Sequence, residues 1–163
     1  MQRLGLIPTS TTVRIPLASL YAGFITLFPV TLYAEVKQMF NTLLVEDNAA
    51  FRRELSDILF AYFPMIGVEE AGNAADALSK VEYLRPDLIF MDIKLPGESG
   101  LELTRQIKQV YAYIVIVILT SYDLPEYRQK AFKNGADCFI SKGQASFLAD
   151  ILARVEGTMA LRQ

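Results

Sequence analysis

The chain has 163 residues, enough for one domain with an ordinary hydrophobic core and a short additional segment. Its formal charge is −2 and it has no long basic run, so it lacks the charge pattern of a nucleic-acid-binding protein. Histidine is absent, which excludes His-based catalytic triads and leaves only oxygen ligands for a metal ion. Cys138 is the sole cysteine, so no intrachain disulfide can form, and a cytoplasmic location fits this composition.

Residues 1–38 differ in character from the rest of the chain. Within them, residues 15–34 carry no charge and are long enough for a membrane-spanning helix. Prolines interrupt this segment, and the arginines ahead of it would place the following domain outside the cytoplasm by the positive-inside rule. Residues 32–34 also make a poor signal-peptidase site. Three interpretations stay open: a dispensable leader with a natural start at Met39, a membrane anchor, and a cleaved signal.

After this segment, short apolar runs alternate with segments whose apolar residues recur at helical spacing. The apolar runs predict five strands, at residues 42–45, 65–71, 87–91, 114–119 and 137–140. The segments between and after them predict five helices, at residues 49–63, 74–84, from 99–100 to about 110, 124–133 and 145–156. Because parallel strands need right-handed crossovers, this alternation predicts a doubly wound α/β sandwich around a parallel sheet.

We expect the apolar stripe of each helix to face the core, because such stripes are core far more often than binding grooves. The inward-facing set includes three residues near the ends of helices, Tyr62, Val110 and Leu148. Asn134 and Gly135 are expected to close the fourth helix.

The stretch 87–100 reads DLIFMDIKLPGESG and holds the residue of greatest interest, Asp92. Its apolar run, Leu88–Met91, is typical of a strand buried on both faces. Asp92 stands at the carboxyl end of that strand, where ligands bind in open α/β sheets. A lone aspartate there is often only a turn residue or a helix cap, so its neighbours decide its meaning.

Polar residues follow three other predicted strands. They are Glu46 and Asp47 after the first, Thr120 and Ser121 after the fourth, and Lys142 after the fifth. The second strand contributes none, as expected of a sheet edge. Each residue alone has an ordinary interpretation as a turn, cap or surface residue, but together they fall on one edge of the sheet.

Clustered carboxylates repel one another, so a site made of Glu46, Asp47 and Asp92 needs a cation. Mg²⁺ is the natural candidate for oxygen ligands, and Mn²⁺ is an alternative. An aspartate beside such a cation, with a hydroxyl and an ammonium group opposite, is arranged to accept a phosphoryl group. Asp92 would then be the nucleophile, Lys142 would stabilise the phosphoryl charge, and Thr120 would donate a hydrogen bond.

From residue 41 to about 156 the chain resembles the receiver domain of two-component response regulators. The resemblance rests on four motifs: LLVEDN at 43–48, DLIFMDIKLPGESG at 87–100, ILTS at 118–121 and GADCFISK at 135–142. It implies a CheY-like, flavodoxin-like (βα)5 fold with strand order 2-1-3-4-5. We therefore divide the chain into a leader at 1–38, a receiver domain at 39–158 and a tail at 159–163.

The resemblance also implies a role for each site residue. It assigns the Mg²⁺ ligands to Glu46, Asp47, Asp92 and the backbone carbonyl of Lys94. It makes Asp92 the phosphoacceptor, served by a sensor histidine kinase or a phosphotransfer protein, with Thr120 and Lys142 binding the phosphoryl group. Phe139 takes the position of the aromatic switch, coupled to Thr120.

Three residues flank the expected phosphoryl group: Lys94, Ser121 and Tyr122. Ser121 is small and leaves the access route open. Lys94 and Tyr122 are long enough to shield a phosphoaspartate from water, which predicts a persistent phosphoryl group. Gly143 departs from the family pattern, in which proline usually follows the lysine, and this leaves the loop before the last helix unpredicted.

The expected output is contact with proteins and not catalysis. The family's usual surface for a downstream partner or a homodimer is formed by the fourth helix, fifth strand and fifth helix, around Tyr127, Lys130, Asp137 and Ala149. No output domain is expected within this chain, so direct nucleic-acid contact is not expected, and membrane contact would require that residues 15–34 form a real anchor. The alternatives are the receiver part of a DNA-binding transcriptional regulator and a receiver-like interaction module. A phosphohydrolase of the haloacid dehalogenase type is disfavoured, because Asp92-Ile-Lys94 lacks the second acid that such enzymes use.

Overall fold

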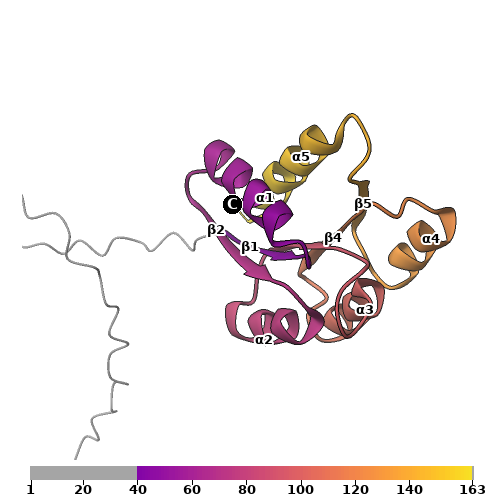
Figure 1. Ribbon diagram of the computed structural model, residues 1–163. Helices are drawn as coiled ribbons and strands as arrows, with labels where there is room; N and C mark the ends of the chain where they lie inside the picture. Colours follow the sequence, from indigo (N-terminus) through magenta and orange to yellow (C-terminus); the bar gives the residue numbers. More distant parts are fainter. Residues whose placement is uncertain (1–39, 163) are drawn as a thin grey trace, which may run out of the picture. The chain divides into compact units, whose positions relative to one another are not determined.

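The computed structural model describes residues 40–162, and these form one parallel sheet flanked by helices (Figure 1). The strands are β1 (Phe40–Val45), β2 (Ile66–Ala71), β3 (Leu88–Met91), β4 (Val115–Thr120) and β5 (Cys138–Ser141). The helices are α1 (Ala49–Tyr62), α2 (Ala74–Leu84), α3 (Gly100–Val110), α4 (Pro125–Lys133) and α5 (Phe147–Ala160). The predicted alternation of five strands and five helices is confirmed.

The strand order is β2-β1-β3-β4-β5, and every pairing is parallel. The predicted flavodoxin-like order is therefore confirmed. The register aligns the last residues of neighbouring strands, for example Val45 with Met91 and Thr120 with Ser141. Successive strands are added on one side of β1 as far as β2 and on its other side from β3 onward, so the carboxyl ends of β1 and β3 form the switch point at which such sheets bind ligands.

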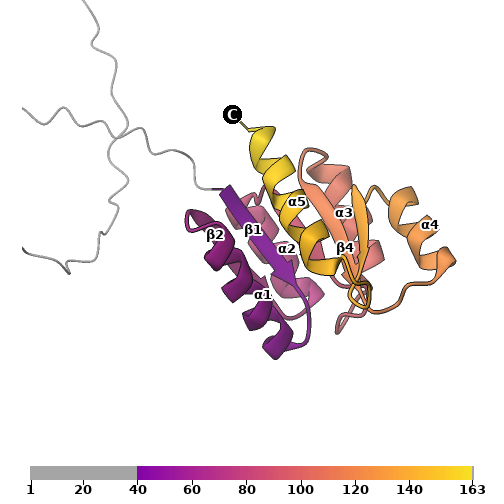
Figure 2. The ribbon, with the colours of Figure 1, turned by 90° about the horizontal axis from the view of Figure 1, so that it is seen from above.

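Helices cover both faces of the sheet (Figures 1 and 2). On one face α1 and α5 pack over a core that includes Leu59, Phe90 and Val155. On the other face α2, α3 and α4 pack over a second core that includes Ile89 and Ile118. All four residues of β3 are buried, because both of its faces are covered.

Side chains at the helix ends explain where several helices start and stop. Asn48, Asn73 and Ser99 each accept backbone N–H bonds at a helix N-terminus, which satisfies donors that the helix leaves unpaired. The fourth helix ends as predicted, since Asn134 is its cap and Gly135 follows with φ of 96°, a conformation that glycine adopts without strain.

Three inward-facing predictions are wrong, and all concern helix ends. Tyr62 and Val110 are 59% and 70% exposed, because each is the last residue of its helix and lies beyond the covered part of the sheet. Leu148, in the first turn of α5, is 36% exposed for the same reason at the other end. Helix α5 also begins later than predicted, at Phe147, and ends later, at Ala160. The later end follows from packing in the last turn, where Thr158 is buried and Met159 packs against the core.

The loop around Gly143 consists of turns that lead into α5. The Gln144 N–H donates to the Ser141 carbonyl at 3.3 Å, and the Phe147 N–H donates to the Gln144 carbonyl at 3.1 Å. The loop with Gly143 in place of the proline expected from the resemblance therefore forms hydrogen-bonded turns.

The apolar segment at residues 15–34 lies outside the described residues. Within residues 40–162, no helix combines the length and the apolar character that crossing a bilayer requires.

Candidate functional site

Acidic residues follow two neighbouring strands at the carboxyl edge of the sheet. Glu46 and Asp47 come directly after β1, and Asp92 comes directly after β3. Backbone pairing continues past both strands, because the Asp92 N–H donates to the Val45 carbonyl at 2.8 Å and the Glu46 N–H donates to the Ala71 carbonyl at 3.0 Å. One carboxylate oxygen from each of the three acids lies within 4.8 Å of the others. The sheet thus brings together the acids that the sequence predicted as one cluster.

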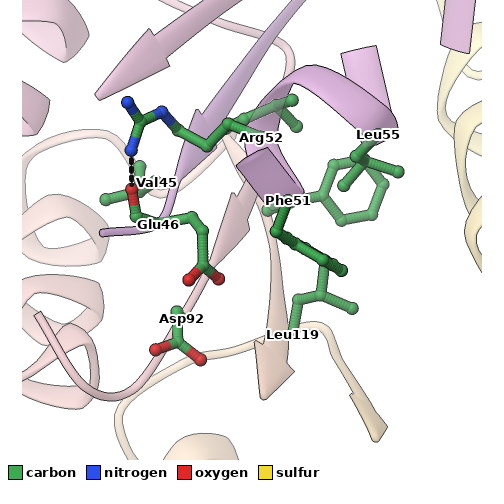
Figure 3. A pocket seen from close by; sticks show the side chains of 9 residues that line it. Val45, Glu46, Phe51, Arg52, Leu55, Asp92 and Leu119 are labelled. Carbon is green, nitrogen blue, oxygen red and sulfur yellow. Dashed lines mark hydrogen bonds between the residues drawn. The ribbon is translucent and has the colours of Figure 1, made fainter. Parts of the chain in front are cut away.

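Two of these acids are buried next to each other. Glu46 and Asp92 are 7% and 5% exposed, whereas Asp47 is exposed. Figure 3 shows the Glu46 and Asp92 side chains side by side below the start of α1. Burial raises the pKa of Glu46; Lys142 opposes that rise and the charge of Asp92 adds to it. A further cation at this point would relieve the repulsion between the two carboxylates.

Lys142, the residue after β5, brings a positive charge to the buried carboxylates. Its Nζ donates to Asp92 Oδ1 at 3.2 Å and forms an ion pair with Glu46 Oε2. The same ammonium group lies 4.5 Å from the centre of the Phe51 ring, and the side chain is only 15% exposed. Residues that are 50 and 96 positions apart in the sequence are therefore joined through one ammonium group.

A hollow of about 320 Å³ opens above these groups. It is lined by Glu46, Asp47, Asn48, Phe51, Asp92, Lys94, Ser121, Tyr122 and Lys142. The predicted flanking residues, Lys94, Ser121 and Tyr122, are all in this lining. The Lys94 ammonium lies 5.2 Å from the centre of the Tyr122 ring, and the Lys94 N–H donates to Asp92 Oδ2 at 3.0 Å.

Residues 42–155 match the family model of the response regulator receiver domain. The chain belongs to this family. Receiver domains are signalling modules of two-component systems, and the resemblance seen in the motifs is confirmed.

Individual relatives agree with the family match. The receiver is 38% identical over 102 residues to the chemotaxis protein CheY of Halobacterium salinarum, a match that covers 63% of this chain and 83% of CheY. It is 36% identical over 104 residues to the DNA-binding transcriptional activator DevR/DosR of Mycobacterium tuberculosis, covering 64% of this chain and 48% of that protein. The chain thus spans about half the length of DevR/DosR, and a similar or smaller share of several other curated relatives.

A solved structure supports the fold in the same way. The CheY-like receiver domain of Methanospirillum hungatei JF-1 superimposes with a TM-score of 0.66 at 27% sequence identity. The superposition covers 75% of this chain and 98% of that chain.

Two predicted residues of the receiver site are not in the lining of the hollow. Thr120, the last residue of β4, is fully buried, and its Oγ1 accepts the Tyr122 N–H at 3.3 Å. Phe139 of β5 is 6% exposed and packs in the core that α4 covers. The Arg128 guanidinium of α4 lies 4.4 Å from the centre of its ring. The aromatic side chain is therefore directed inward.

A supporting group that the sequence patterns did not reveal lies on the other side of the acidic loop. Arg52 of α1 donates to the backbone carbonyls of Glu46 and Asp47, and it pairs with Glu70 of β2. As predicted, β2 is an edge strand and none of its residues is in the acidic cluster or the lining of the hollow; Glu70 acts on the site only through Arg52. The sequence feature that could have revealed it is the position of Arg52, one turn into a helix that starts just after the acidic pair Glu46-Asp47.

The donor set of the acidic cluster fits a hard divalent cation. Its candidate ligands are carboxylate oxygens, and the chain contains no histidine. Mg²⁺ and Mn²⁺ take such ligands, with water completing the shell.

Proposed function

We propose that this receiver domain accepts a phosphoryl group on Asp92 from a sensor histidine kinase or a phosphotransfer protein. The observation that carries the proposal is the position of Asp92, which lies between other carboxylates and the Lys142 ammonium in a hollow of about 320 Å³. A carboxylate so placed can act as a nucleophile toward phosphorus, because the groups around it can hold both a cation and the oxygens of the incoming phosphoryl group.

The proposed transfer is a substitution at phosphorus. A carboxylate oxygen of Asp92 attacks the phosphorus of a phosphohistidine; an O–P bond forms, the P–N bond breaks, and the imidazole nitrogen keeps the electron pair. Lys142, 3.2 Å from Asp92 Oδ1, would pair with a phosphoryl oxygen. Thr120 Oγ1 accepts the Tyr122 N–H, so its own proton is available to another phosphoryl oxygen.

Glu46, Asp47, Asp92 and the backbone carbonyl of Lys94 would hold Mg²⁺. The ion would supply charge stabilisation for the phosphoryl oxygens as they approach Asp92. The raised pKa of Glu46 is consistent with this role, because a buried carboxylate with an acidic neighbour gains from a divalent cation.

The output of phosphorylation would be a change in a protein-binding surface. Phe139 and Thr120 would act as the switch, with Phe139 held inward when Thr120 engages the phosphoryl group. The surface of α4, β5 and α5, around Tyr127, Lys130, Asp137 and Ala149, would bind a downstream protein or a second copy of the chain. Asp137 forms an ion pair with Lys108 of α3 at 2.7 Å, so the negative charge that it presents to a partner would be partly balanced.

A second candidate is that the chain is the receiver part of a DNA-binding transcriptional regulator. It is favoured by the match to DevR/DosR, a DNA-binding transcriptional activator of which this chain covers 48%. The reading frame downstream of codon 163 in the genomic sequence would test it. A helical DNA-binding segment continuing in the same frame would support this candidate.

The direct test is incubation of the full chain with acetyl phosphate or phosphoramidate and Mg²⁺, followed by intact mass measurement. We expect one phosphate adduct that is acid-stable and base-labile. Asp92→Ala should lose the adduct, whereas Asp57→Ala, at an exposed aspartate of α1, should keep it. A wild-type chain that binds Mg²⁺ without forming an adduct would instead be a receiver-like interaction module. Sustained turnover of a generic phosphate ester would contradict the prediction that the domain is not an enzyme.

A further inference from the structure

Arg52 holds the backbone of the acidic loop from the side opposite the hollow. Its Nη1 donates to the Glu46 carbonyl at 2.5 Å and to the Asp47 carbonyl at 3.2 Å. Figure 3 shows the guanidinium group above the loop, joined to the Glu46 carbonyl, while the Glu46 carboxylate is directed away from it toward Asp92. One side chain therefore fixes two consecutive residues that both carry candidate metal ligands.

Arg52 is itself held in place by β2 and α1. Its Nε donates to Glu70 Oε2 at 2.9 Å, and Ser56 Oγ donates to the other oxygen, Glu70 Oε1, at 3.1 Å. Lys80 of α2 donates to the Glu70 backbone carbonyl. The Arg52 side chain is only 16% exposed and lies over the turn at Gly72, where an added Cβ would come within 3.5 Å of Nη1. Little freedom remains for the guanidinium group.

The charges in this network explain how an arginine can support a cation site. An unpaired guanidinium beside the acidic loop would repel a divalent cation. Glu70 neutralises Arg52 on the side away from the hollow, so the pair supplies hydrogen bonds to the loop with little net charge. Mg²⁺ demands near-ideal octahedral geometry, which makes its affinity sensitive to the position of each ligand. Groups that orient metal ligands typically change metal affinity about 10–100-fold when they are removed.

We propose that Arg52 is a positioning residue of the acidic site. It holds the Glu46 and Asp47 backbone so that their carboxylates share one cation with Asp92, and Glu70 keeps Arg52 in position and balances its charge. This inference rests on the metal site of the proposed function and extends it to residues that do not touch the metal.

The test is a calorimetric titration of the full chain with Mg²⁺, which measures the dissociation constant. A second titration uses Mn²⁺, whose free concentration is measured by electron paramagnetic resonance. Arg52→Gln should raise the dissociation constant about tenfold. Arg52→Lys should weaken binding similarly, because one ammonium group cannot reproduce the planar contacts to two carbonyls and a carboxylate. Arg53→Gln, at an exposed arginine one position along the same helix, should bind like the wild type.

A positioning role and a general loss of structure give different results. If Arg52 positions the ligands, Arg52→Gln should form as much phosphate adduct on Asp92 as the wild type once Mg²⁺ is saturating. The Mg²⁺ concentration that gives half of the maximal adduct should be higher in the variant. A lower plateau at saturating Mg²⁺ would contradict the inference. Glu70→Gln provides a second variant that keeps Arg52, and we expect it to weaken Mg²⁺ binding by a smaller factor.

The outcomes separate this inference from the proposed function. Wild-type Mg²⁺ affinity in Arg52→Gln would overturn the inference alone, since Asp92 could still be phosphorylated. Full affinity in Arg52→Lys would also overturn it, because charge and not position would then be the cause. A wild-type chain that binds no Mg²⁺ would overturn both the metal site and this inference.

Discussion

Lys142 supplies the positive charge beside two buried carboxylates, and its removal gives a prediction for stability. Lys142→Met leaves Glu46 and Asp92 facing each other without that charge, and we expect the metal-free chain to lose about 1–3 kcal/mol at neutral pH. The pKa of Glu46 is already raised by burial, and removing Lys142 raises it further. When the pKa of a carboxyl group is higher in the folded state than in the unfolded state, the group stabilises the fold at pH values below its unfolded-state pKa. This stabilisation is lost as the pH rises through its folded-state pKa. The deficit of the variant should therefore grow as the pH rises.

Urea unfolding in the presence of a chelator, at pH 5 and pH 7.5, would measure this deficit. Lys133→Met, at an exposed lysine of α4, serves as the control and should change stability little at either pH. A Lys142→Met deficit that is equal at both pH values would contradict the electrostatic explanation.

Lys94 and Tyr122 lead to a prediction for the lifetime of the phosphoryl group. Both line the hollow, and the Lys94 ammonium lies against the Tyr122 ring, so we expect them to limit the approach of water to a phosphoryl group on Asp92. The double variant Lys94→Ala, Tyr122→Ala should lose its phosphoryl group several-fold faster than the wild type. The decay of the phosphate adduct by intact mass measures this rate. Tyr113→Ala, at an exposed tyrosine outside the hollow, should decay like the wild type, and an unchanged rate in the double variant would exclude shielding.

At the scale of residues, the chain order predicts some parts of the site and not others. Asp92 and Lys142 stand directly after strands, and parallel pairing alone brings such residues to one edge. The link between Arg52 and Glu70 depends on how α1 lies across β2, which no local pattern specifies. Tyr62 was misplaced because helical spacing identifies a face but does not show where the covering element ends.

At the scale of elements, the close approach of α3 to the end of β3 places a strict limit on one position. A Cβ added to Gly100, the first residue of α3, would lie 1.9 Å from the backbone carbonyl oxygen of Asp92. Gly100→Ala must therefore displace either helix α3 or the backbone of Asp92. We expect a loss of at least about 3 kcal/mol in unfolding free energy and a weaker acetyl-phosphate reaction.

Gly157 offers a matched control for this change in another helix. It is an exposed residue of α5, and an added Cβ would meet nothing within 4 Å. Gly157→Ala should stabilise the domain by about 0.5–1 kcal/mol, because alanine is the better helix former and restricts the unfolded chain. Thermal unfolding of both variants would measure the contrast, and equal effects at Gly100 and Gly157 would contradict the close approach.

The helices and strands themselves were largely predictable from local sequence. The run Leu88–Met91 has no polar residue and is bounded by turn residues, which is typical of a short strand covered on both faces. Asn48, Asn73 and Ser99 mark helix starts by hydrogen-bonding chemistry that depends on nearby residues alone. The end of α5 was not predictable in this way, because its last turn is extended by packing of Thr158 and Met159 and not by a capping signal.

At the scale of the whole molecule, an ion pair joins the segment after α5 to the end of the sheet that lies away from Asp92. The Arg162 guanidinium forms an ion pair with Oδ1 of the buried Asp87, just ahead of β3. The other oxygen of Asp87 accepts the Asn41 N–H at 2.7 Å, whereas no group other than Arg162 among the described residues donates to Oδ1. Arg162 is thus the cation available to a carboxylate that is 3% exposed.

Arg162→Ala should therefore cost about 1 kcal/mol of stability, a value reduced from that of a fully buried pair because Arg162 is partly exposed. Arg105→Ala removes an ion pair with Glu102 at the surface and should cost less. Urea unfolding of the two variants measures both values. If the Arg105 variant lost as much stability as the Arg162 variant, burial of Asp87 would not be the reason.

Asp92 lies at the carboxyl ends of the strands, and both ends of the described chain lie at the opposite ends of the strands. This arrangement has a practical consequence for the design of fusion proteins. Figure 2 shows the start of β1 and the C-terminal end of α5 on the same side of the domain. Phe40 opens β1 on that side, where Arg162 meets Asp87, whereas Asp92 follows β3 at the carboxyl ends of the strands. A strand of six residues such as β4 spans roughly 20 Å. A reporter protein appended after Arg162 would leave the Asp92 end of the sheet open to the proposed phosphoryl donor, and it would also be too far away to sense a charge added to Asp92 directly. A biosensor built from this domain would need its second label on α4 or on the loop that holds Tyr122.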